Sequence, residues 1–193
     1  ILDILTRVTR KMTEGELIQL TVLGKADLSE QEYFEVLQRK TAFLFSACCE
    51  IGAILGKAMP EQQAALRDYG MNLGIAFQLA DDLLDFTANE EELGKAAGAD
   101  LLEGKMTLPL ILLLQKAPQM RESLEKIMYD GNYDQISRES ILSTMQTHGI
   151  FEETFKKAHN YAQAARKNLA GLAETQYSSM LADIPSYIVE RNK

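Results

Sequence analysis

The chain has 193 residues, of which 28 are acidic and 20 are basic, giving a net charge of −8. This length suits one domain with a substantial core. The acidic balance argues against a general nucleic-acid binder, because no broad basic surface is available to neutralise phosphates. The apolar stretch 108–114 is too short to span a bilayer, and the cysteines Cys48 and Cys49 are neighbours that make a poor disulfide. We therefore expect a cytoplasmic protein with no stable membrane insertion.

Apolar side chains recur at helical spacing along almost the whole chain. The first helix is expected over residues 1–20, and Ser29-Glu-Gln-Glu32 is a capping-box signature that opens a second helix, running to Leu55. Pro60 can occupy the first turn of a third helix, which extends to about residue 86. Further helices are expected at 107–116, 118–129, 137–148, 150–171 and 174–192. The pattern predicts a single all-α domain over residues 1–193.

An acidic stripe occupies the end of the third helix, where residues 74–85 read Gly-Ile-Ala-Phe-Gln-Leu-Ala-Asp-Asp-Leu-Leu-Asp. At about 100° per residue, Gln78, Asp81, Asp82 and Asp85 share one narrow face, and the rest of the helix is apolar. Burying these carboxylates together is costly without a cation. Oxygen ligands without histidine or thiolate suit Mg²⁺ rather than zinc. The stripe predicts a magnesium site that faces a polar cavity.

Three lysines could serve such a site. The stretch 87–107 is rich in glycine and charge, as expected for a loop, and it supplies Lys95 and Lys105. Lys40 interrupts an apolar helical run and could therefore point inward. Magnesium that is bound by only a few carboxylates commonly also binds phosphate oxygens of a substrate, so these lysines are candidates for binding that phosphate. Their spacing alone fits solvent-exposed lysines equally well.

Four segments, in order, resemble the trans-isoprenyl diphosphate synthases. The stripe at 74–85 resembles the second aspartate-rich motif of that family. The other matches are Glu14-Gly-Glu-Leu-Ile-Gln19, Lys40-Thr-Ala-Phe-Leu44, and a loop containing Gly94-Lys95, Asp100 and Gly104-Lys-Met-Thr-Leu-Pro109. A DDxxD string alone is a weak signal, whereas four ordered segments over residues 14–109 are specific. The resemblance implies an all-α helical bundle of the isoprenoid synthase type.

The resemblance also implies a reaction, in which Mg²⁺ and lysines stabilise the diphosphate that leaves an allylic diphosphate, and isopentenyl diphosphate then attacks the allylic carbon. It assigns metal binding to Asp81, Asp82, Asp85 and Asp100. It assigns diphosphate binding to Lys40, Lys95 and Lys105. It places Thr41 and Gln78 beside the reacting centre, and Glu16 and Gln19 at or behind the cavity wall. The family's usual homodimer is implied as well, with a heteromer as the alternative.

One departure from the family pattern limits these expectations. The family carries a first aspartate-rich motif on an earlier helix, and this chain contains no second DDxxD. The resemblance covers roughly the C-terminal two-thirds of such an enzyme, so we expect the isolated chain to be inactive or nearly so. The alternatives are a non-catalytic subunit of a heteromeric synthase, and a terpene cyclase or head-to-head synthase. The loop pattern around Lys95 and Lys105 favours the chain-elongating enzymes.

Overall fold

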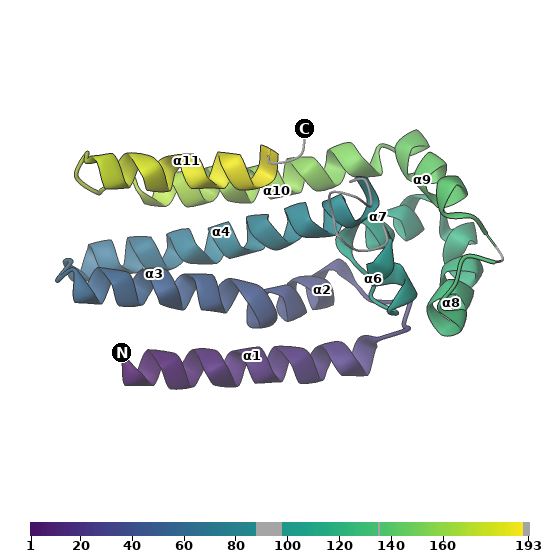
Figure 1. Cartoon of the computed structure of the whole chain (residues 1–193), viewed down its shortest axis with the longest axis horizontal. Coiled ribbons are helices and arrows are strands. Elements are labelled where there is room, and N and C mark those ends of the chain that lie inside the picture. The colour runs from purple at the N-terminus through teal and green to yellow at the C-terminus, as the bar shows by residue number, and fades with distance from the viewer. Residues whose placement is uncertain (88–97, 135, 191–193) are drawn as a thin grey trace.

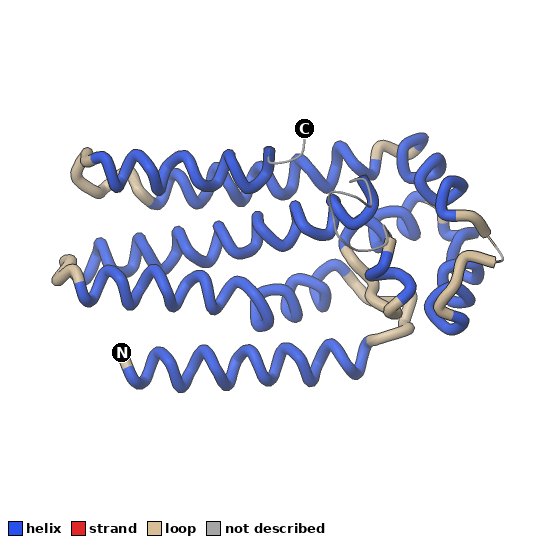
Figure 2. Tube along the Cα trace, in the orientation of Figure 1, coloured by secondary structure: helices blue, strands red, loops and turns tan. Residues whose placement is uncertain are grey.

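The computed structural model describes residues 1–87, 98–134 and 136–190, and every regular element within these ranges is a helix (Figures 1 and 2). The expected all-α fold is therefore confirmed. The elements are α1 (Leu2–Val22), α2 (Glu30–Leu37), the π-helix η1 (Gln38–Ala42), α3 (Phe43–Leu55), α4 (Pro60–Thr87), α6 (Ala99–Leu102), α7 (Leu108–Lys116), the 3₁₀ turn η2 (Pro118–Met120), α8 (Arg121–Asp130), α9 (Arg138–Thr147), α10 (Ile150–Asn168) and α11 (Gln176–Glu190).

The long helix α4 is the centre of the bundle. It packs against α3 on one side and α10 on the other, and Figure 1 shows α1, α3, α4 and the α10–α11 pair running alongside one another, with α6 to α9 gathered at one end. The acidic stripe lies in the last turns of α4, at this end. Among the described residues, no helix is both long and apolar enough to cross a membrane.

Two predicted helix starts are confirmed. The Ser29 side chain accepts a hydrogen bond from the Glu32 backbone N–H, and the Glu32 carboxylate accepts one from the Ser29 N–H, which completes the capping box at the start of α2. Helix α4 begins at Pro60, where the missing N–H of proline costs nothing. Toward the C-terminus, the predicted 174–192 helix is α11, with residues 191 and 192 outside the described range.

The chain is helical from Glu30 to Leu55, as predicted, but the middle of this helix is not a regular α-helix. Residues Gln38–Ala42 form a π-helix, in which the Phe43 N–H bonds to the Gln38 carbonyl five residues earlier. This π-helix packs closely between α1 and α4, and each of those helices has a glycine at the point of contact. A Cβ added to Gly15 of α1 would lie 2.8 Å from the Lys40 nitrogen, and one added to Gly74 of α4 would lie 2.7 Å from the Ala42 Cα. Side-chain periodicity carries no signal for such packing between distant segments.

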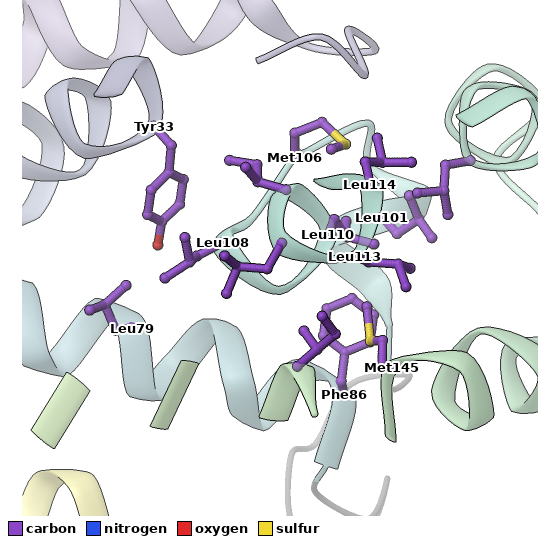
Figure 3. Packing of buried hydrophobic residues seen from close by; sticks show 14 of the residues in the cluster. Tyr33, Leu79, Phe86, Leu101, Met106, Leu108, Leu110, Leu113, Leu114 and Met145 are labelled. Carbon is purple, nitrogen blue, oxygen red and sulfur yellow. The ribbon is translucent and has the colours of Figure 1, made fainter. Parts of the chain in front are cut away.

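Helix α7 forms the support beneath the acidic end of α4. Every residue from Leu108 to Leu114 is buried, as expected for a helix that is apolar on all sides. Figure 3 shows its leucines packed around Phe86 and Met145, with the ring of Tyr33 reaching from α2 toward α4 beside Leu108. Because this core holds the last turns of α4 and the ring of Tyr33, it fixes the position of the polar groups described next.

Candidate functional site

A cavity of about 300 Å³ lies beside the last turns of α4. Its wall is built from α1, α2, η1, α4, α6 and the segment that follows α6. Apolar side chains of α1 and α2 form part of the wall. The polar groups are those of Gln19, Tyr33, Lys40, Thr41, Gln78, Asp81, Asp82, Asp100, Lys105 and Thr107. The cavity therefore combines acidic and basic groups with an apolar surface.

Most of the predicted acidic stripe faces this cavity. Gln78, Asp81 and Asp82 line it from α4, and Asp100 lines it from α6. Asp85 is placed differently, because it is fully buried and does not belong to the lining. Its Oδ2 accepts a hydrogen bond from the Asp100 backbone N–H at 3.2 Å, so Asp85 braces the turn that carries another of the predicted ligands.

Asp82 is a carboxyl group of the site whose pKa is raised. It is only 2% exposed, and its two oxygens accept hydrogen bonds from the Tyr33 hydroxyl and, at 2.9 Å, from the Gln78 amide. Burial raises the pKa of Asp82 to about 7, since those two hydrogen bonds only partly oppose burial and the negative charges of Asp100 and Asp81 add to it. A cation bound beside Asp82 would favour its ionised form, which burial and the neighbouring negative charges oppose.

Lys40 and Thr41 reach the cavity from the π-helix. The Lys40 ammonium donates a hydrogen bond to Gln19 Oε1 at 2.6 Å and lies 3.2 Å from Glu16 Oε1. Both α1 residues expected at or behind the cavity wall thus contact Lys40, and of the two only Gln19 belongs to the lining. The Thr41 hydroxyl donates to Gln78 Oε1 at 3.0 Å, which fixes the orientation in which the Gln78 amide group donates to Asp82.

Lys105 contacts the acidic side of the cavity directly. Its ammonium lies 3.0 Å from Asp100 Oδ1 and 2.6 Å from Glu103 Oε2. Partial burial lowers the pKa of Lys105, but the hydrogen bonds and charges of Glu103 and Asp100 outweigh burial and raise that pKa above its ordinary value. Lys105 is therefore a permanent cation beside Asp100. The third predicted lysine, Lys95, lies outside the described residues.

Tyr33 belongs to the site and was not anticipated from the sequence. It lies on α2, its pKa is raised well above the ordinary value by burial and by the neighbouring Asp82 charge, and its hydroxyl therefore stays protonated as a donor. Figure 3 shows that hydroxyl at the tip of the ring, directed toward α4. The only sequence signal available is a polar atom on an otherwise apolar helix face, which is common in cores.

The donor chemistry of the cavity fits magnesium. Its acidic groups are aspartates, and neither histidine nor cysteine belongs to the described lining. Within the described ranges, no three histidine, cysteine or acidic side chains already converge as a ready metal site. The carboxylates instead have protein partners in this state, such as Lys105 on Asp100 and Tyr33 and Gln78 on Asp82. Magnesium usually keeps several waters and takes substrate phosphate oxygens, so it needs few protein ligands.

Comparison with known proteins gives consistent relatives. The sequence profile of the polyprenyl synthetase family matches residues 1–145. The octaprenyl diphosphate synthase of Escherichia coli (strain K12) is 35% identical over 194 aligned residues, which cover 100% of this chain and 60% of that protein. The short chain isoprenyl diphosphate synthase of Methanothermobacter thermautotrophicus is 36% identical, over 94% of this chain and 55% of its own length. The chain thus spans about 60% or less of the length of these curated relatives.

Solved structures agree with the sequence relatives. A polyprenyl synthase from Caulobacter crescentus CB15, complexed with calcium and isoprenyl diphosphate, superposes with a TM-score of 0.92 at 37% identity, covering 100% of this chain and 59% of that one. A decaprenyl diphosphate synthase from Rhodobacter capsulatus gives a TM-score of 0.90 at 38% identity, again over 100% and 59%. The bundle is thus of the isoprenyl synthase type. The chain belongs to the polyprenyl synthetase family.

Proposed function

We propose that the protein carrying this chain is a magnesium-dependent prenyltransferase that condenses an allylic diphosphate with isopentenyl diphosphate. The observation that carries the proposal is one cavity that is lined by Asp81, Asp82 and Asp100 together with Lys40 and Lys105, with the Lys105 ammonium 3.0 Å from Asp100 Oδ1. Carboxylates alone would suit a cation, and lysines alone would suit an anion. Both together suit a diphosphate that binds with magnesium.

The residues divide into three roles. Asp81, Asp82 and Asp100 would hold magnesium, and the predicted ligand Asp85 would act with them through the Asp100 turn that it supports. Magnesium, when bound, supplies positive charge that stabilises the departing diphosphate. The ammonium groups of Lys40 and Lys105 add fixed positive charge to the same leaving group, and Lys95 is the third candidate. Thr41 and Gln78 present oriented side-chain dipoles beside the reacting carbon.

The reaction that we propose breaks the bond between the allylic carbon and the diphosphate oxygen, and the bonding electrons leave with the diphosphate. The double bond of isopentenyl diphosphate then supplies two electrons to form the new carbon–carbon bond at the allylic carbon. Loss of a proton from the attacking unit restores a double bond, so the products are a longer prenyl diphosphate and inorganic diphosphate. The apolar wall of the cavity excludes water from the allylic cation, which water would otherwise capture.

The first prediction tests this assignment by turnover. Labelled isopentenyl diphosphate and an allylic diphosphate are supplied with and without Mg²⁺ to the protein that carries this chain. We expect a longer prenyl diphosphate only when Mg²⁺ is present, and a loss of about 10³-fold in the Asp81→Asn/Asp82→Asn double variant, because both substitutions remove a charged oxygen ligand. Asp68→Asn, on the same helix but outside the cavity, serves as the matched control and should retain full turnover.

Other outcomes of that assay point to other functions. Consumption of the allylic diphosphate without isopentenyl diphosphate would identify a cyclase or a head-to-head synthase, and the need for a second polypeptide would identify a subunit of a heteromeric synthase. Full turnover by the double variant would contradict the metal assignment. For the 193-residue chain assayed alone we expect little or no turnover, because it contributes a single aspartate-rich motif.

A further inference from the structure

We propose that Tyr33 is a positioning residue that orients the Asp82 carboxylate for the cation in this cavity. The inference rests on the proposed function in taking Asp82 as a magnesium ligand. It adds a residue from α2, outside every motif that the sequence resemblance marked, to the groups on which magnesium binding depends.

The geometry around Asp82 carries the inference. Both oxygens of the carboxylate accept hydrogen bonds from side chains. The Tyr33 hydroxyl of α2 donates to Oδ2, and the Gln78 amide of α4 donates to Oδ1. The two donors are themselves held in place. Tyr33 is 7% exposed as a whole residue, and its ring lies edge-on to Phe34 with ring centres 5.4 Å apart. The Gln78 amide is oriented by Thr41.

A carboxylate with both oxygens bonded cannot rotate freely about its last torsion. The remaining lone pairs of Asp82 therefore point in a fixed direction, toward the cavity that it lines with Asp81 and Asp100. Hydrogen-bond partners of metal ligands act in this way, and their loss costs 10-fold to 100-fold in metal affinity in typical sites. Gln78 fixes one oxygen from the carboxylate's own helix, so Tyr33 is the group that fixes the other from the opposite wall.

A purely structural role for Tyr33 makes a different prediction. The ring belongs to the apolar core around α7, and Figure 3 shows it beside Leu108. Tyr33→Phe keeps this ring and removes only the hydroxyl group. If packing is the whole role of Tyr33, the variant should bind magnesium as the unaltered protein does.

Tyr69 offers a matched control on α4. It is also fully buried, and its hydroxyl donates to the Leu181 carbonyl at 2.8 Å, far from the cavity lining. Tyr33→Phe and Tyr69→Phe thus delete the same atom from buried tyrosines that each make one hydrogen bond. A general loss of stability should appear in both variants, whereas an effect on the cation should appear in Tyr33→Phe alone.

The experiment measures Mg²⁺ affinity by titration calorimetry, with inorganic diphosphate present, and the Mg²⁺ concentration that gives half-maximal turnover. For Tyr33→Phe we expect affinity to fall 10-fold to 100-fold, the half-maximal Mg²⁺ concentration to rise in parallel, and kcat at saturating Mg²⁺ to change less than threefold. For Tyr69→Phe we expect less than a twofold change in each quantity.

The outcomes separate this inference from the proposed function. Equal Mg²⁺ affinity in Tyr33→Phe and the unaltered protein overturns the inference, even if prenyl transfer is observed. A selective loss of Mg²⁺ affinity in Tyr33→Phe supports it, even if no prenyl product forms, in which case the proposed reaction alone is wrong. Equal losses in Tyr33→Phe and Tyr69→Phe also overturn it, because they assign the effect to packing.

Discussion

The three aspartates of one short motif occupy three different environments. Asp81 lines the cavity, Asp82 lines it while nearly buried between two donors, and Asp85 is buried behind it and braces a backbone turn. Helical spacing correctly places these side chains on one face of α4. It cannot distinguish them, because the difference is made by Tyr33, 49 residues before Asp82, and by the Asp100 N–H.

Asp82 predicts a pH dependence of stability for the metal-free protein. Its pKa rises from 3.8 to about 7 on folding, so the folded state retains a proton that the unfolded chain has lost. That contribution is complete below about pH 4 and disappears as the pH rises through about 7. Asp82→Asn cannot titrate. Relative to the unaltered protein, the free energy of unfolding of Asp82→Asn should therefore increase from pH 4 to pH 8 by on the order of 4 kcal/mol.

Urea unfolding of both proteins across this range, with a metal chelator present, measures the difference. Asp68→Asn is the matched control for removing a carboxylate from the same helix, since Asp68 is half-exposed and lies outside the cavity lining. A difference for Asp82→Asn that is flat with pH would mean that the folded protein does not hold the proton on Asp82.

Among the helices, the sequence predicted two helix starts correctly but did not predict the π-helix inside the segment from Glu30 to Leu55. The capping box at Ser29 and the proline at residue 60 act within their own first turns, so the sequence alone predicts them. The π-helix Gln38–Ala42 depends instead on α1 and α4, which approach it through Gly15 and Gly74. The prediction that Lys40 points inward came from an interrupted apolar run. It is correct because it depends only on the helix face on which Lys40 lies, and not on whether the backbone there forms an α turn or a π turn.

The contact between α4 and the π-helix predicts opposite effects for two helical glycines. Gly74→Ala places a Cβ 2.7 Å from the Ala42 Cα, where backbone must move, whereas Gly52→Ala in α3 meets nothing within 4 Å. Both changes gain helix propensity. We expect Gly52→Ala to raise the free energy of unfolding by up to about 1 kcal/mol, and Gly74→Ala to lower it by about 1–3 kcal/mol.

Chemical denaturation of the two single variants measures this difference, with the double variant as a test of additivity. Because both variants gain the same helix propensity, the difference between their free energies of unfolding measures the packing of α4 on the π-helix. Stabilisation by Gly74→Ala would mean that the two segments are less closely packed in solution.

At the scale of the whole molecule, the site is assembled from parts that lie far apart in sequence. Its polar wall begins at Gln19 and ends at Thr107, and it is held in shape by α7 and by α10, which both pack against α4. The ordered motifs predicted Gln19, Lys40, Thr41, Gln78, Asp81, Asp82, Asp100 and Lys105 of this wall. The sequence did not predict which side chains form hydrogen bonds with one another, such as Lys40 with Gln19, because these pairs depend on how the helices are arranged in space.

This assembly predicts that two simple ligands bind cooperatively. Mg²⁺ and inorganic diphosphate bind together in this cavity in our proposal, and the positive charge of one stabilises the negative charge of the other. Thermal unfolding should therefore show a midpoint with both ligands that exceeds the sum of their separate shifts by about 5 °C. The excess should be absent in Asp81→Asn and retained in Asp68→Asn. Strictly additive shifts in the unaltered protein would argue against a shared site.

The π-helix also constrains how this protein can tolerate insertions and deletions. A π turn spans one more residue than an α turn, so deleting one residue between Gln38 and Ala42 would allow a regular helix to form. Because the π turn completes about the same rotation with one residue more, such a deletion would leave α3, with buried residues such as Ala47 and Ala53, close to its present orientation, and would change the directions in which residues inside the turn project. The extra residue of this segment is thus tied to the positions of Lys40 and Thr41 at the cavity rather than to the packing of α3.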